Sequence, residues 1–109
     1  MFKSGMVVMA PDGDPEKHRA SIKTSKIELT VALCQLFNFD QVASVCRDMV
    51  QEDGVQSLIL CPGCTHEAVA RVVEAVGPGI AVNVARGDVP GVMATADLLG
   101  KEGWFPAAH

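Results

Sequence analysis

Short apolar runs alternate along the chain with longer segments in which apolar residues recur at three- and four-residue spacing. The runs at 5–10 and 80–85 are almost continuously apolar, which is typical of strands buried on both faces of a sheet, and residues 55–60, which end in the apolar run 58–60, predict a further strand. Residues 26–33 instead alternate between apolar and more polar side chains, which predicts a half-exposed strand at a sheet edge. The pattern therefore predicts four strands.

Helices are predicted between and after these strands. Residues 39–50 and 66–76 each place their apolar side chains on one helical face. A short helix is expected at about 15–22, because the Asp-Pro-Glu sequence at its start is typical of a helix N-terminus. A weaker helical pattern covers 92–99, and residues 100–109 are expected to form a C-terminal tail.

The alternation of strands and helices predicts βαβ units and a mainly parallel sheet. With right-handed crossovers, the four strands take the flavodoxin-like order 2-1-3-4 in a single small three-layer α/β domain that spans 1–109. The strand at 80–85 would then form a sheet edge although it is nearly all apolar. We therefore expect the C-terminal segment or a second copy of the chain to cover it, and we predict a homo-oligomer.

The composition argues against several classes of protein. Of the 109 residues, 49% are hydrophobic and 20% are charged, as in one globular domain. The net charge is −4, and the nine Lys and Arg residues are scattered without a basic stripe, so no nucleic-acid partner is expected. No apolar run reaches the roughly 18 residues of a membrane span, and the N-terminus lacks a signal-peptide pattern. We therefore expect a cytoplasmic protein with no membrane partner, whose four cysteines are free thiols, ligands or redox groups.

Ligands of open α/β sheets bind at the carboxyl ends of the strands, near the point where the strand order reverses. The ends of the first and third strands, with an arginine after the fourth, predict an anion-binding site composed of Asp12, Asp14, Gly63, Thr65, His66 and Arg86. Gly63 would let the backbone approach a ligand, the N–H groups after Thr65 would face it, and Arg86 would pair with a carboxylate or phosphate. Neither a P-loop nor a G-x-G-x-x-G sequence is present, so no nucleotide or other cofactor is named.

Cys61-Pro62-Gly63-Cys64 is the strongest local motif, and it has three interpretations. As a redox pair, Cys61 would gain thiolate character near a helix N-terminus, but the motif differs from thioredoxins in its Pro-Gly order, in lacking a preceding Trp and in following the third strand. As a metal site, Cys61, Cys64 and His66 have ligand-like spacing, but a second ligand pair is missing. We favour the third interpretation, in which Cys61 ends a buried strand and Pro-Gly makes the turn.

The chain resembles a known family in the stretches 14–19, 28–31, 60–61 and 67–77. These are similar to a family of small uncharacterised bacterial α/β proteins, classed as a domain of unknown function, and the resemblance runs from the N-terminus to about residue 86. It implies a single α/β domain and brings no activity or catalytic residue. Members of that family tend to carry a glycine-rich turn where this chain has Pro62-Gly63-Cys64-Thr65, so Cys64 departs from the family pattern, which counts against a family-wide dithiol or metal role.

Three functional hypotheses follow from these residues. The first is an oligomeric domain that binds a small anionic ligand at the strand ends. The second is a thiol–disulfide or metal-binding protein that uses Cys61 and Cys64. The third is an assembly module without catalytic activity. No motif decides whether the protein catalyses a reaction.

Overall fold

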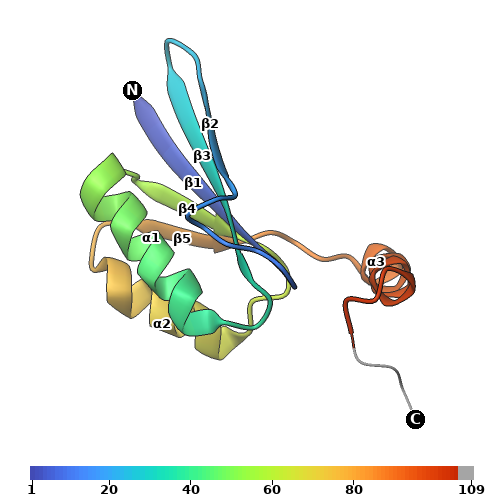
Figure 1. The fold of residues 1–109 in the computed structure, drawn as a ribbon. Coiled ribbons are helices and arrows are strands. Elements are labelled where there is room, and N and C mark those ends of the chain that lie inside the picture. Colours follow the sequence, from blue (N-terminus) through green and yellow to red (C-terminus); the bar gives the residue numbers. More distant parts are fainter. Residues whose placement is uncertain (106–109) are drawn as a thin grey trace.

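The computed structural model describes residues 1–105, which form a small compact α/β domain around a five-stranded sheet (Figure 1). The sheet has the order β2-β3-β1-β4-β5, in which β2 is antiparallel to β3 and the other pairs are parallel. Its strands are β1 (Phe2–Ala10), β2 (Arg19–Lys23), β3 (Ile27–Gln35), β4 (Ser57–Leu60) and β5 (Ala81–Val84). The helices are α1 (Phe39–Asp53), α2 (His66–Val76) and α3 (Val89–Lys101).

The α/β class and the mainly parallel sheet are confirmed, and the four predicted strands keep their predicted order as β3, β1, β4 and β5. The difference is β2, an additional edge strand where a helix was expected at about 15–22. Asp14 does not cap a helix; its carboxylate accepts from the N–H of Glu16 at 3.0 Å within a turn. The next residues alternate at strand period and pair with β3, from Arg19 opposite Ala32 to Lys23 opposite Glu28. The strand expected at the edge therefore lies one position inside it.

Both α1 and α2 cover the same face of the sheet (Figure 1). The chain crosses from β3 to β4 and from β4 to β5 in the same direction, so right-handed crossovers place both helices on one side. The connection from β1 to β3 runs the other way and would have put a helix on the opposite side, but it contains β2 instead. Within residues 1–105 the sheet therefore has one covered and one open face, in place of the three layers expected.

The hydrophobic core lies between the sheet and the two packed helices. The side chains that fill it include Val7, Leu58, Leu60, Val42, Met49 and Val72, all of which are buried. Gly5 of β1 leaves room for the helix, because a Cβ at that position would lie 2.8 Å from Sδ of Met49. The ends of α1 are fixed by Asn38, whose side-chain oxygen accepts from the N–H of Gln41 at 3.1 Å, and by Gly54 at a φ of 73°.

In β3 the row of smaller and more polar side chains faces the helices, although the more apolar row would be expected there. Thr30, Ala32 and Cys34 are the residues buried beneath the helices, and the Thr30 hydroxyl is satisfied by Ser21 at 2.9 Å. The more apolar row, which includes Leu29 and Val31, faces the open side and is only half-buried. The open face of the sheet is thus the apolar face of this strand.

Helix α3 lies beyond the carboxyl end of the sheet, away from α1 and α2 (Figure 1). It is longer than the predicted segment 92–99 and includes the first two residues of the predicted tail. None of its residues is buried. The last four residues of that tail, 106–109, lie outside the described part of the chain. Within residues 1–105, no helix is both long and apolar enough to cross a membrane.

Candidate functional site

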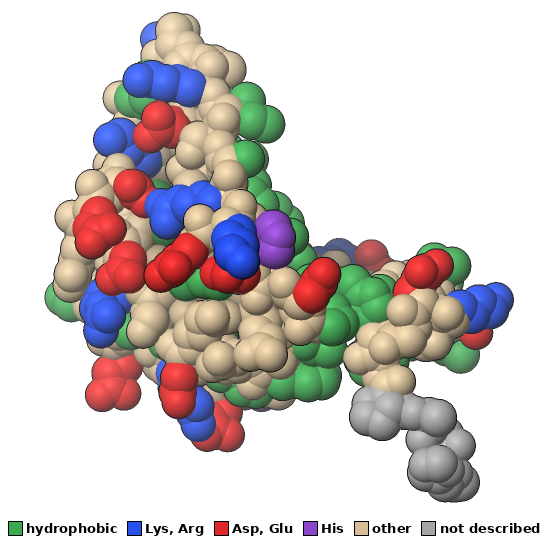
Figure 2. Space-filling model, viewed as in Figure 1, with side chains coloured by type: hydrophobic (Ala, Val, Ile, Leu, Met, Phe, Trp, Pro, Cys, Tyr) green, Lys and Arg blue, Asp and Glu red, His purple; other side chains and the backbone are tan. Residues whose placement is uncertain are grey.

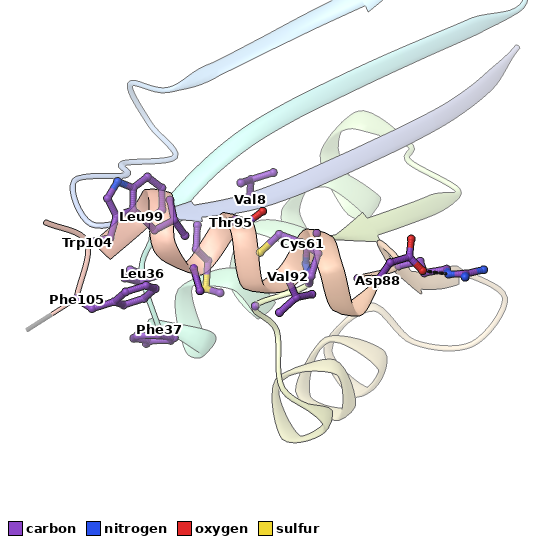
Figure 3. Close-up of a pocket in the computed structure, with 17 residues that line it drawn as sticks. Val8, Leu36, Phe37, Cys61, Asp88, Val92, Thr95, Leu99, Trp104 and Phe105 are labelled. Carbon is purple, nitrogen blue, oxygen red and sulfur yellow. Dashed lines mark hydrogen bonds and ion pairs between the residues drawn. The ribbon is translucent and has the colours of Figure 1, made fainter. Parts of the chain in front are cut away.

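A cavity of about 670 Å³ lies between the carboxyl ends of the strands and helix α3 (Figure 3). Its floor includes Val8 of β1 and the turn that follows β4, and one wall is the segment after β3, with Leu36 and Phe37. The opposite wall is α3, from which Val92 and Leu99 face the sheet. These walls are almost entirely apolar. The cavity occupies the edge of the sheet at which the sequence placed a site.

The turn Cys61-Pro62-Gly63-Cys64 brings the first thiol to the cavity. Cys61 extends the sheet ladder by one residue, because its N–H donates to the carbonyl of Val7 at 3.1 Å. The turn then closes through the N–H of Cys64, which donates to the carbonyl of Cys61 at 3.1 Å. As a result Cys61 is half-buried and lines the cavity, whereas Cys64 is buried in the core beside α2.

The two thiols of this turn have opposite electrostatic preferences. A hydrogen bond from the Cys64 thiol lowers the pKa of Cys61 to about 6; burial opposes this shift, and backbone hydrogen bonds at Met9 and Gly63 add to it. The same bond, together with burial, raises the pKa of Cys64. At neutral pH the pair therefore holds one proton on Cys64 and a thiolate on Cys61.

The two remaining cysteines belong to the core. Burial raises the pKa of Cys34 to about 11 and that of Cys46 to about 12, so both stay protonated at neutral pH. Neither lines the cavity. This agrees with the structural interpretation of Cys46 as a residue on the apolar face of its helix.

Arg86 and Asp88 lie at the mouth of the cavity. Arg86 Nε donates to Oδ1 of Asp88 at 2.7 Å, and both side chains are largely exposed (Figure 3). Asp88 precedes α3 as its N-cap residue, but its side chain makes no capping hydrogen bond. Among the described residues that line the cavity, Arg86 is thus the one cationic side chain, and its partner is a solvent-exposed carboxylate.

The structure brings together only part of the predicted site. Gly63, Cys61 and Arg86 line the cavity. Thr65 caps α2, its hydroxyl accepting from the N–H of Ala68 at 3.2 Å, and His66 is exposed in the first turn of that helix.

The two predicted acidic residues lie outside the cavity. Asp12 is exposed in the turn after β1 and does not line it. Asp14 borders a separate hollow of about 310 Å³ beside α1, together with Glu16 and Asp48. The N–H of Asp14 donates to Nδ1 of His18 at 3.0 Å. This second hollow is bordered by more acidic than basic side chains, which does not suit an anion.

The apolar walls were absent from the predicted site. Leu36, Phe37, Leu99, Trp104 and Phe105 all line the cavity. The one available signal was the pair of aromatic residues in the C-terminal segment, which on its own indicates packing and not ligand binding. The five wall residues come from segments far apart in the sequence, and they line one cavity only because α3 lies beside the strand ends.

Within residues 1–105, no three His, Cys, Asp or Glu side chains lie in an arrangement that would hold a metal ion. His66 in particular is exposed, whereas Cys64 is buried. The metal interpretation of the turn gains no support from this part of the chain.

A family of unknown function matches the chain over residues 2–97. No curated protein and no solved structure matches it. The resemblance to an uncharacterised family that the sequence indicated is therefore confirmed, and a bacterial origin stays a prediction.

Proposed function

The chain belongs to DUF6506, a family of unknown function, and we propose that this protein is a small-ligand-binding domain whose site is the cavity between the strand ends and α3. The observation that carries the proposal is a hollow of about 670 Å³ at the carboxyl edge of the sheet, walled by apolar side chains, with one arginine at its mouth. Ligand pockets commonly measure about 300–1,000 Å³ and combine apolar walls with a few polar groups. Open α/β sheets also bind their ligands at this edge.

The chemistry of the cavity favours a ligand with an apolar body and one anionic end. The body would contact Val8, Leu36 and Leu99 within the cavity. The anionic end would replace Asp88 as the partner of Arg86, whose planar guanidinium suits a carboxylate or phosphate. Because the Arg86–Asp88 pair is exposed, breaking it costs little.

Trp104 supplies a direct readout, because it lines the cavity and is the single tryptophan of the chain. We expect decanoate to change its fluorescence and to raise the melting temperature, and decanol to bind about tenfold more weakly, as the loss of a charge-assisted hydrogen bond implies. Arg86→Gln should bring the two affinities together. The matched control is Arg71→Gln, because Arg71 is exposed on α2 and pairs with Asp40 and Glu67. If neither probe shifts the fluorescence or the melting temperature, the cavity is not a site for this class of ligand.

A second candidate function is thiol–disulfide exchange, and the position of Cys61 in the cavity favours it. The Cys61 thiolate would attack one sulfur of a substrate disulfide, form a mixed disulfide and release the first substrate thiolate. Cys64 would then lose its proton and attack Cys61, which releases the second substrate thiolate and leaves a Cys61–Cys64 disulfide. A small cellular thiol would reduce that disulfide again.

The exchange hypothesis is tested by incubating the reduced protein with oxidised glutathione and measuring the Cys61–Cys64 disulfide by mass spectrometry. Cys64→Ser should accumulate the mixed disulfide at Cys61. Recovery of four unmodified thiols would contradict the hypothesis. We propose a cytoplasmic location, in which the four thiols would stay reduced.

A further inference from the structure

The cavity combines apolar walls with a reactive thiol. Of the four cysteines, all of which lie within residues 1–105, only Cys61 lines it. Leu36 and Leu99 belong to its walls (Figure 3). Figure 2 shows hydrophobic side chains where the body of the domain meets α3, while charged side chains gather over α1. A molecule that reaches the Cys61 thiol through the cavity must therefore suit an apolar environment.

Helix α3 has a cavity side and a charged side. The charged side is turned away from the cavity and carries Asp97 and Lys101, which pair at 3.1 Å. A Cβ at Gly91 would meet no heavy atom within 4 Å, so the space beside this part of the helix is open. The residues of α3 that line the cavity recur at three- and four-residue spacing and are mostly small: Gly91, Val92, Thr95, Ala96 and Leu99. The helix thus leaves room for a ligand.

The two thiols of the turn after β4 have different surroundings. Cys61 lines the cavity, whereas Cys64 is buried in the hydrophobic core and does not line it. The Cys64 thiol lowers the pKa of Cys61 to about 6, and the pKa of Cys64 itself is raised. A substrate in the cavity therefore meets a thiolate at Cys61, and a protonated thiol lies on the core side of that thiolate.

This arrangement suits the cleavage of a peroxide bond. Such a reaction needs a thiolate that attacks one oxygen, a proton for the oxygen that leaves, and a second thiol that removes the bound oxygen from sulfur. Cys61 supplies the first group, and Cys64 supplies the other two. The common small disulfides of cells are charged, and the apolar walls give such charges no partners. An organic hydroperoxide instead carries its reactive group on an apolar body.

We propose that the protein reduces the hydroperoxides of unsaturated fatty acids, with the hydrocarbon chain in the cavity, the peroxide at Cys61 and the carboxylate on Arg86. In such a molecule the peroxide lies along the chain and not at the charged end. This matches a thiol within the cavity and an arginine at its mouth. The reaction requires the cavity to bind an apolar body with an anionic end, so it rests on the proposed function.

The reaction balances with the two thiols as the reductant. The Cys61 thiolate attacks the terminal oxygen of the hydroperoxide, so that a sulfur–oxygen bond forms and the oxygen–oxygen bond breaks. The leaving alkoxide takes the proton of Cys64 and departs as the alcohol. The Cys64 thiolate then attacks the Cys61 sulfur, forms the disulfide and releases hydroxide. The hydroperoxide is thereby reduced to an alcohol, and a small cellular thiol reduces the disulfide again.

Three peroxides test the proposal: the hydroperoxide of linoleic acid, its methyl ester and hydrogen peroxide. The Cys61–Cys64 disulfide is measured by mass spectrometry and the alcohol by chromatography. We expect the fatty-acid hydroperoxide to oxidise the pair about 100-fold faster than hydrogen peroxide, because the cavity holds it beside the thiolate. The ester should react about tenfold more slowly than the acid, and Arg86→Gln should remove that difference. Equal rates for all three peroxides would overturn the proposal.

Two phenylalanine substitutions on α3 test whether the substrate enters the cavity. Ala96→Phe fills part of the cavity and should slow the reaction with the fatty-acid hydroperoxide about tenfold or more. Ala94→Phe is the matched control, because Ala94 is exposed on the same helix and does not line the cavity. Equal rates for the two variants would contradict the proposed route.

Cys64→Ser tests the order of the two thiol steps. This variant should release one alcohol per chain and keep a sulfenic acid at Cys61, which dimedone traps for mass spectrometry. Cys61→Ser should release no alcohol. Formation of the alcohol by Cys61→Ser, or a dimedone adduct at another cysteine, would show that Cys61 is not the attacking thiol.

Decanoate separates a failure of this reaction from a failure of the ligand site. If decanoate binds and protects Cys61 from the fatty-acid hydroperoxide, both proposals are supported. If decanoate binds but the hydroperoxide leaves Cys61 and Cys64 reduced, the cavity is a ligand site and the peroxide reaction is wrong. If decanoate does not bind and the fatty-acid hydroperoxide reacts no faster than hydrogen peroxide, both proposals are wrong.

Discussion

The N–H of Cys64 donates to the carbonyl of Cys61 at 3.1 Å across a four-residue turn, but only the Cys61 thiol faces the cavity. Across the same turn the Cys64 thiol lowers the pKa of Cys61, and the Cys61 thiolate and burial together keep the proton on Cys64. The pair thus presents a single nucleophile to whatever occupies the cavity. This asymmetry is a consequence of the strand that ends at Leu60 and of the helix capped by Thr65, between which the turn is held.

Alkylation of Cys61 should follow a titration with a midpoint near pH 6. Because the pKa of Cys61 is lowered to about 6, most of this thiol is ionised at pH 7, whereas an ordinary thiol with a pKa of 9.0 is not. We expect iodoacetamide to modify Cys61 first and Cys34, Cys46 and Cys64 far more slowly, as mass spectrometry of the peptides will show.

The control for this titration is Cys64→Ala, which removes the thiol that donates to Cys61. The midpoint should then move up toward the ordinary value, because the largest cause of the lowered pKa is lost. A midpoint that stays near pH 6 in this variant would assign the shift to the backbone hydrogen bonds instead.

The free energy of unfolding of the reduced protein should pass through a maximum near pH 9. Between about pH 6 and pH 9 the folded chain has already lost the Cys61 proton that the unfolded chain still binds, so stability rises with pH. Above pH 9 the unfolded chain loses protons that the raised pKa values of Cys34, Cys46 and Cys64 retain in the folded chain, so stability falls. Urea titrations across this range measure both limbs.

Cys61→Ser separates the two limbs of this profile. The substitution removes the group whose folded pKa is lowered, so the rise below pH 9 should disappear. The fall above pH 9 should persist, because burial still raises the pKa values of Cys34, Cys46 and Cys64 when the contribution of Cys61 is lost. A profile that stays unaltered would show that Cys61 titrates alike in the folded and unfolded chains.

Local signals in the sequence were sufficient for most of the elements. The apolar spacing that predicted α1 and α2 depends on residues close together in the chain, and the structure confirms both helices. The order of the parallel strands also followed, because crossover handedness leaves few arrangements for such a pattern. These features need no knowledge of which distant residues meet.

The features that escaped prediction depend on distant contacts. The sequence around Asp14 has the composition of a helix start, but pairing with β3 makes residues 19–23 a strand. The alternation in β3 defines two faces but does not show which of them the helices cover. Because the connection between β1 and β3 contains β2 and no helix, only the face that carries Thr30, Ala32 and Cys34 is covered. The cavity likewise combines Leu36, Cys61 and Leu99 from three separate segments, and the motif at Cys61 does not show that the other two lie beside it.

Gly13→Ala should destabilise the domain by about 3 kcal/mol, the upper end of the range for a substitution that forces extra atoms into packed backbone. A Cβ at Gly13 would lie 2.1 Å from the carbonyl oxygen of Cys34 and 2.7 Å from its carbonyl carbon. Both are main-chain atoms at the end of β3, so no side-chain rotation relieves the clash. The turn after β1 must therefore move away from β3, which weakens the bond from the N–H of Leu36 to the carbonyl of Ala10, at 2.8 Å in the native chain.

The matched control for this substitution is Gly91→Ala in α3, where no heavy atom lies within 4 Å of the added Cβ. Alanine favours a helix over glycine by about 1 kcal/mol, so this variant should be at least as stable as the native chain. Chemical denaturation of the three proteins measures the difference. Equal denaturation midpoints for Gly13→Ala and Gly91→Ala would show that the turn after β1 does not pack against β3. The position of Leu36 in the cavity wall, which depends on that packing, would then be in error.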